Sequence, residues 1–151
     1  MAIKKLNVVP LLAADEGYLL DEQIGFLLRV AMQRHTSIFG SRMLEGLTQT
    51  QFAALAKLYE VGPCSQNQLG RLIYLDAATI KGVVDRLSLR RLVTVVSDTR
   101  DRRRRAVALT PRGREITAAA INIADEITVQ TLAPLSSDEQ ITLRRLLNRL
   151  S

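Results

Sequence analysis

The side chains with the clearest chemical potential in this sequence are arginines, and they are concentrated in one segment. Residues 86–105 contain eight arginines and two aspartates, which gives this segment a net charge of +6. The whole chain of 151 residues also carries +6, from 21 basic and 15 acidic residues, so the rest of the chain is neutral overall. A localised basic surface is typical of a polyanion binder. We therefore expect nucleic acid to be the main partner.

The densest charge lies in the stretch DTRDRRRR at residues 98–105. Five of its last six residues are arginines, which repel one another and destabilise the loop unless an anion compensates. Insertion into a DNA minor groove would provide that compensation, because the negative potential of the groove attracts arginine. A solvated basic turn is the alternative. We expect Asp98 and Asp101 to brace the loop by pairing with neighbouring arginines.

The sequence contains few residues that could support catalysis, metal binding or a disulfide. The chain has one histidine, His35, and one cysteine, Cys64, which cannot form an internal disulfide, a four-ligand zinc site or a plausible hydrolase triad. The sequence also lacks a glycine-rich phosphate-binding loop. We therefore expect no enzyme, no metal and no cofactor. Because no uncharged stretch approaches about 18 residues, we also expect a cytoplasmic protein without membrane contact.

The elements that position the arginines are predicted from apolar periodicity and capping residues. These signals predict helices at 21–43, 49–60 and 65–73, from Asp76 onward, at 111–133 and from Ser136 onward. Capping-box spacing is present in the pairs Thr48–Gln51, Ser65–Gln68 and Ser136–Glu139. Short β-branched and apolar runs at 93–96 and 106–109 predict a β-hairpin with the arginines at its tip. The expected fold class is mainly α with a small β-hairpin.

The helix that follows Asp76 has two contrasting faces. Its buried stripe is expected to contain Ile80, Val83, Val84 and Leu87. On the opposite side, the small residues Ala78 and Gly82 lie between Lys81 and Arg86. Such a face would let the backbone approach a groove floor while the cations reach phosphates or base edges. The alternative is a solvated helix face.

The terminal helices are long for the small core that they flank. The helix from Pro111 carries Ile116, Ala120, Ile123 and Ile127, whose spacing is that of a coiled-coil seam. An amphipathic face left over after folding is best buried against a second copy of the chain, which predicts a homodimer. Alternatively, these helices complete the core of a monomer.

The order of these elements resembles the winged helix-turn-helix regulators of the MarR family. The resemblance covers residues 47–113 and is carried by LTQTQFAALAKL, SQNQLGRLI, DAATIKGVVDRLSLRRLV and DTRDRRRRAVALTPRG. It includes the Asp-x-x-Asp-Arg-Arg signature of the wing at Asp98, Asp101, Arg102 and Arg103.

The resemblance implies a single domain of residues 1–151 that acts as a sequence-specific transcriptional regulator, most often a repressor. Residues 21–45 and 111–150 would form dimerisation helices, and residues 47–110 the winged helix-turn-helix. A dimer of this type reads half-sites about 34 Å apart, so a pseudo-palindromic DNA operator is expected. The alternative is a nucleic-acid-binding protein without operator specificity, which would use the same arginines without reading bases.

The resemblance also assigns DNA contacts by position. In the first helix of the motif these are Ser65, Gln66 and Asn67; in the recognition helix Ala77, Ala78, Thr79, Lys81 and Arg86; in the wing Arg100, Arg102, Arg103 and Arg104. Arg103 matches the minor-groove arginine of the family and Asp101 its bracing acid. Because Arg102–Arg105 are consecutive, a neighbouring arginine is the alternative for insertion.

Family members often respond to small aromatic or heteroaromatic acids, and the resemblance therefore implies an effector. His35 is the main candidate to contact it, because histidine titrates near neutrality and donates to carboxylates. Further candidates are Arg34, Ser41, Arg42, Phe52 and Tyr59. A packed core histidine and core aromatics are the alternatives. Some relatives sense oxidation through a cysteine, so Cys64 is either a redox sensor or an inert small residue.

Overall fold

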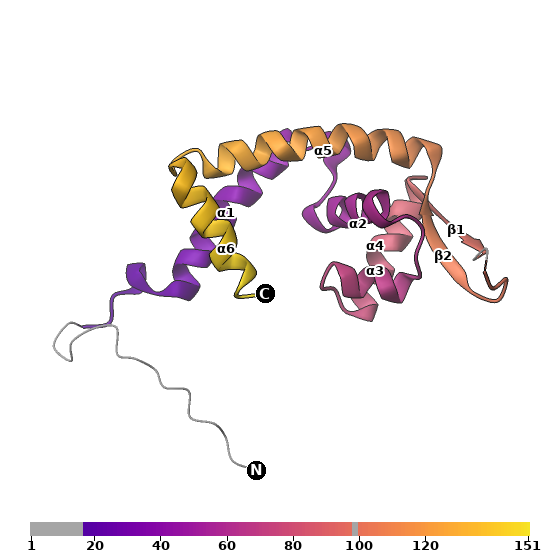
Figure 1. Ribbon diagram of the computed structural model, residues 1–151, viewed down its shortest axis with the longest axis horizontal. Helices are drawn as coiled ribbons and strands as arrows, with labels where there is room; N and C mark the ends of the chain where they lie inside the picture. Colours follow the sequence, from indigo (N-terminus) through magenta and orange to yellow (C-terminus); the bar gives the residue numbers. More distant parts are fainter. Residues whose placement is uncertain (1–16, 98–99) are drawn as a thin grey trace, which may run out of the picture. The chain divides into compact units, whose positions relative to one another are not determined.

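The computed structural model describes residues 17–97 and 100–151 (Figure 1). Asp98 lies outside the described residues. The described residues form two compact units, which divide within helix α1 (Ile24–Arg42) between Gln33 and Arg34. The first unit contains a 3₁₀ turn, η1 (Leu20–Glu22), and the beginning of α1. Gln23 is extended, with φ −79° and ψ 131°, so α1 begins at Ile24 and not at Asp21 as predicted.

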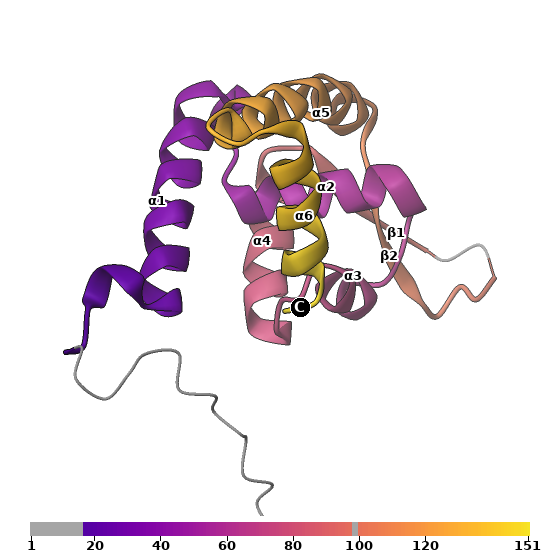
Figure 2. The same ribbon diagram turned by 60° about the vertical axis from the view of Figure 1, so that its left-hand side comes forward.

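The second unit contains the remaining helices and the hairpin. After α1 the order is η2 (Leu44–Gly46), α2 (Gln49–Val61), α3 (Gln66–Leu72), α4 (Ala77–Leu89), β1 (Val93–Ser97), β2 (Arg105–Leu109), α5 (Pro111–Leu132) and α6 (Ser137–Asn148). Figure 2 shows α5 lying over α2, with α3 and α4 beneath and the hairpin at one side. The predicted fold class, mainly α with a small β-hairpin, is confirmed.

The predicted helix starts are explained by side-chain caps. Thr48 and Ser136 form complete capping boxes with Gln51 and Glu139. Ser65 makes the first half of the predicted box, because its hydroxyl accepts the Gln68 N–H at 3.1 Å. Each cap pairs backbone N–H groups that the first helical turn leaves without a helical acceptor.

The core of the second unit lies where α2, α3, α4 and α5 meet. Leu55 and Leu58 of α2, Leu69 of α3, Ile80 and Leu87 of α4, and Ile127 of α5 are each less than 2% exposed. Ala120 and Ile127 are buried in this core, and Ile116 and Ile123 pack against it. The face of α5 predicted to be a coiled-coil seam therefore packs within its own chain. A 4-3-4 apolar spacing does not distinguish an intramolecular partner from a second copy of the chain, and on this face the partner is intramolecular.

The hairpin is joined to the helical core at two places. β1 and β2 pair antiparallel in the register Val93↔Leu109 to Ser97↔Arg105. Cys64, in the segment before α3, extends this pairing: its N–H donates to Val107 at 3.2 Å and its carbonyl accepts from Val107 at 2.8 Å. At the other end, Gly113 of α5 lies so close to Leu92 that a Cβ at position 113 would come within 1.9 Å of the Leu92 carbonyl oxygen. These contacts attach the middle of β2 and the residue before β1 to the helical core.

None of the helices in residues 17–97 and 100–151 combines the length and apolarity needed to cross a lipid bilayer.

Candidate nucleic-acid interface and ligand cavity

Helix α4 presents one apolar and one exposed face, as its sequence predicts. Its apolar stripe, Ile80, Val83, Val84 and Leu87, is buried. The residues expected to contact DNA are exposed on this helix: Ala77, Ala78, Thr79, Lys81 and Arg86. Gly82 lies among them, and a Cβ at this position would meet the Arg86 guanidinium at 3.5 Å. A close approach to a flat or grooved surface is therefore sterically possible along this face.

A salt bridge on this face was not predicted. Lys81 Nζ lies 2.7 Å from Asp85 Oδ2, with the two side chains 66% and 57% exposed. An exposed pair of this kind contributes only about 0.3–0.5 kcal/mol, so a phosphate or an acceptor on a base edge can replace Asp85 as the partner of Lys81. The i,i+4 spacing of the two residues was the available sequence signal.

The start of α4 is held by its cap and by close packing against α3. Asp76 Oδ1 accepts the Thr79 N–H at 2.7 Å. This bond from the Thr79 backbone, with one from its side chain, lowers the pKa of the Asp76 carboxyl, so the cap is ionised at neutral pH. A Cβ on Gly70 of α3 would come within 3.1 Å of Ile80. The two helices of the motif therefore meet at close range.

The tip of the hairpin is organised around Asp101. Its carboxylate accepts the backbone N–H of Arg103 at 3.0 Å and lies 3.8 Å from Nε of Arg104. Arg100, Arg102, Arg103, Arg104 and Arg105 are all exposed. Nearby opposite charge at Asp101 offsets part of the repulsion within the run.

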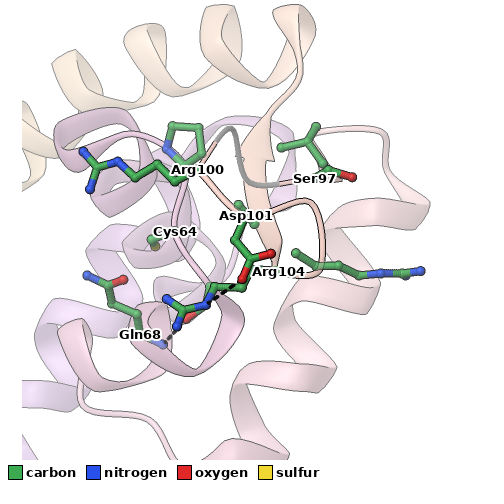
Figure 3. Close-up of a pocket in the computed structure, with 11 residues that line it drawn as sticks. Cys64, Gln68, Ser97, Arg100, Asp101 and Arg104 are labelled. Carbon is green, nitrogen blue, oxygen red and sulfur yellow. Dashed lines mark hydrogen bonds and ion pairs between the residues drawn. The ribbon is translucent and has the colours of Figure 1, made fainter.

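The wing and the start of α3 enclose a hollow of about 560 Å³ (Figure 3). Its lining combines Ser65 and Gln68 of the α3 start with Arg100, Asp101, Arg104 and Arg105 of the hairpin. In Figure 3 the side chains of Arg100, Asp101 and Arg104 lie around the same hollow as Gln68 and Cys64. The structure thus brings two separate groups of predicted DNA contacts together. Gln68 was predicted only as a capping partner.

Cys64 lies in the wall of this hollow and is buried. Burial raises the pKa of its thiol, because desolvation disfavours the thiolate. The thiolate is the reactive form of cysteine. The environment therefore favours the inert interpretation of Cys64 over redox sensing.

A second cavity, of about 200 Å³, lies between the end of α1, α2 and α5. It is lined by His35, Phe39, Gln49, Phe52, Ala124, Ile127 and Thr128. His35 Nδ1 lies 2.9 Å from the Thr131 hydroxyl of α5, and its ring is tilted against Phe39 at 6.2 Å. Phe39 and Gln49 also line an adjoining groove of about 490 Å³ at the α1–α2 connection. The structure therefore places His35 and Phe52, two of the predicted effector contacts, in one cavity.

The other predicted effector contacts do not line this cavity. Arg34 donates to the Gln130 carbonyl at 2.9 Å, and Arg42 forms an ion pair with Glu126 at 2.6 Å. The Ser41 hydroxyl donates to Ile38 at 2.9 Å. Tyr59 packs instead against the guanidinium of Arg114, 5.3 Å from its ring centroid. Arg34, Ser41 and Arg42 are close to His35 in the sequence but do not share its cavity, because successive helical residues point in different directions.

Comparison with known proteins gives consistent matches. The family model "MarR family" matches residues 47–104. The HTH-type transcriptional repressor NicR of Pseudomonas putida is 39% identical over 134 residues, which is 88% of this chain and 85% of NicR. A probable transcriptional regulator from Pseudomonas aeruginosa has a solved structure with 55% identity and a TM-score of 0.84, covering 88% of this chain and all of that one.

A third match is a protein whose DNA binding is regulated by a small molecule. The matched protein is BpsR of Bordetella bronchiseptica, whose DNA binding is regulated by 6-hydroxynicotinic acid. Its sequence is 37% identical to this chain, and its structure matches with a TM-score of 0.82. The match covers 89% of this chain and 97% of that one. With its recognition-like helix α4 and its arginine-rich wing, the chain belongs to the MarR family of winged helix-turn-helix, DNA-binding transcriptional regulators.

Proposed function

We propose that this chain is a homodimeric repressor that binds a pseudo-palindromic operator and is released by a small aromatic or heteroaromatic acid. The observation that carries the proposal is the exposed face of α4 beside an arginine-rich wing that shares a hollow with α3. Small residues flanked by cations suit a major groove, and exposed arginines suit a minor groove. Similarity to the transcriptional repressor NicR supports repression as the mode of regulation.

The exposed apolar residues of the terminal helices support self-association. In the first unit, Ile24, Leu27 and Leu28 are exposed, and in the second unit Val129 and Ile141. Within each unit, large apolar side chains left exposed in this way are typical of residues that a partner covers. The proposed organisation is one domain of residues 1–151, with dimerisation residues in 21–45 and 111–150 and the DNA-reading part in 47–110.

The cavity at His35 supports a ligand-responsive regulator. Apolar and aromatic side chains line the cavity together with the His35 imidazole, Gln49 and Thr128, and a mainly apolar lining with a few polar groups is usual for a small-molecule site. The imidazole donates to a carboxylate when it is protonated. BpsR, whose DNA binding is regulated by 6-hydroxynicotinic acid, suggests the class of effector.

Operator specificity is tested by selecting a duplex from a random-sequence library with the wild-type protein. Fluorescence anisotropy then compares the selected duplex with a scrambled duplex at the same salt concentration. A regulator should prefer the selected duplex by at least about 1,000-fold. Equal affinities would support the alternative, a nonspecific nucleic-acid-binding protein.

Effector response is tested by adding 6-hydroxynicotinic acid to the preformed complex. We expect the affinity for the selected duplex to fall by about five- to 150-fold, the usual range of allosteric coupling. His35→Ala should keep the affinity measured without ligand and lose the response, whereas acetate at the same concentration should have no effect on either protein. A full response in His35→Ala would place the effector elsewhere.

A further inference from the structure

Three charged residues from three separate elements form a closed ring of contacts at the C-terminal end of α4. Arg90, at the end of α4, donates through Nη2 to the Glu45 carbonyl oxygen at 2.5 Å. Arg112, in the first turn of α5, donates through Nη2 to Glu45 Oε2 at 3.2 Å and through Nη1 to the Arg90 carbonyl at 2.8 Å. Each residue of the ring therefore contacts the other two.

The ring lies where α4 ends and the wing begins. The Arg90 carbonyl is at the C-cap of α4, where a cation such as Arg112 is favourable because helix carbonyls lack partners there. The next residues are held by α5: the Thr110 hydroxyl donates to the Arg91 carbonyl at 2.7 Å, and the Thr110 N–H donates to Leu92 at 3.1 Å. The end of α4 and the start of α5 are thus joined directly.

Glu45 adds the third connection, to the α1–α2 segment. It lies in η2 with φ 57°, in the left-handed region that few L-residues adopt. Its side chain is 37% exposed and those of Arg90 and Arg112 are 29% and 50% exposed, so the ring is partly shielded from water. Charge-assisted contacts are stronger and more directional in such surroundings than at a fully exposed site.

We propose that Glu45 is a positioning residue for DNA recognition, which holds the end of α4 and the base of the wing through Arg90 and Arg112. The inference rests on the proposed function, because it assigns α4 the reading of bases. Glu45 does not touch DNA in this scheme. It fixes the angle at which α4 enters the groove.

The direction in which one substitution changes DNA affinity distinguishes a positioning role of Glu45 from a simple effect of its charge. Glu45→Gln removes a negative charge and raises the net charge of the chain from +6 to +7, which by charge alone should strengthen DNA binding. If Glu45 positions α4, the variant should instead bind the selected duplex about three- to tenfold more weakly. Its affinity for a scrambled duplex should not fall, because phosphate contacts dominate nonspecific binding.

Glu115→Gln is the matched control, because it makes the same charge change on an exposed side chain of α5, one turn after Arg112. We expect this control to bind the selected duplex as tightly as wild type or slightly more tightly. Arg112→Lys keeps the charge but cannot make both contacts, and should weaken selective binding without changing the slope of log K against log salt. Glu45→Gln behaving like Glu115→Gln, or an equal loss on both duplexes, would overturn the proposal.

Hydrogen exchange gives a readout that needs no DNA. In Glu45→Gln, the amides of Arg91 and Leu92, which close the end of α4, should exchange faster, while the Leu58 amide in α2 should keep its wild-type rate. A uniform increase across the chain would indicate general destabilisation and contradict positioning. If wild type selects no duplex, the proposed function fails, and unchanged exchange at Arg91 and Leu92 would separately reject the role of Glu45.

Discussion

Two residues that follow helix ends have a left-handed backbone conformation, which glycine adopts most easily. Tyr74 after α3 and Arg91 after α4 each have φ 59°. Both follow the hydrogen-bond pattern of a Schellman motif, with Leu75 N–H donating to Gly70 and Leu92 N–H to Leu87. A residue other than glycine costs about 1–2 kcal/mol in this conformation. Tyr74 is also 85% exposed, so packing returns little of that cost.

Replacing Arg91 with glycine should therefore stabilise the protein. We expect Arg91→Gly to raise the free energy of unfolding by about 0.5–1 kcal/mol, because relief of the left-handed strain exceeds the added flexibility of the unfolded chain. Urea denaturation measures the change. Leu89→Gly, at the last residue of α4, is the control and should lower the free energy of unfolding by up to about 1 kcal/mol. Destabilisation by both variants would show that Arg91 makes a compensating contact.

Arg103 is the wing residue for which DNA contact is expected most directly. Its backbone N–H is held by Asp101, whereas the neighbouring Arg104 has its guanidinium next to that carboxylate. We expect Arg103→Ala to weaken binding to the selected duplex roughly tenfold and to reduce the salt slope by about 1. Arg104→Ala is the comparison. A larger loss for Arg104→Ala would move the inserted arginine by one position.

At the scale of elements, the sequence predicted the helices and the hairpin but not how they are joined. Capping residues act within three positions of the helix they start, so Thr48 and Ser136 were recognisable from sequence. The bridge between Cys64 and Val107 joins residues more than forty positions apart. No local pattern encodes such a pairing, because it depends on how α3 and the hairpin pack.

The contact between α5 and the hairpin base is tested by adding one methyl group. In Gly113→Ala the new Cβ would overlap the Leu92 carbonyl oxygen, which belongs to the backbone and cannot rotate away. We expect the free energy of unfolding to fall by about 3 kcal/mol or more. Gly40→Ala, in α1 with open space around its Cβ position, should leave stability unchanged or raise it by up to about 1 kcal/mol. Thermal denaturation of both variants provides the comparison.

At the scale of the whole molecule, exposed apolar residues indicate the dimer interface better than the apolar spacing of α5 does. The face of α5 that carries Ala120 and Ile127 is buried within the second unit. The surface that remains for a partner includes Val129 of α5 and Ile141 of α6, which are 71% and 68% exposed. Dimerisation is therefore expected to use faces of the terminal helices other than the one that carries Ala120 and Ile127.

This expectation can be checked by light scattering. A charge at Ile141 would be buried without a partner in a dimer, so Ile141→Glu should shift the mass from a dimer towards 16.8 kDa and weaken operator binding. Val61→Glu, which places the same charge on an exposed apolar residue of α2, should leave the mass unchanged. A monomeric wild type would instead support the interpretation that the terminal helices complete a single-chain core.

Short-range signals in the sequence were sufficient for the fold class, the exposed face of α4, the arginine-rich hairpin and most helix starts, because each depends on residues a few positions apart. Packing was required to bring His35 next to Thr131, Gln68 next to the wing, and Glu45 next to Arg90 and Arg112. These contacts join distant segments, and the angles between helices that create them arise from the whole core rather than from any one stretch of sequence.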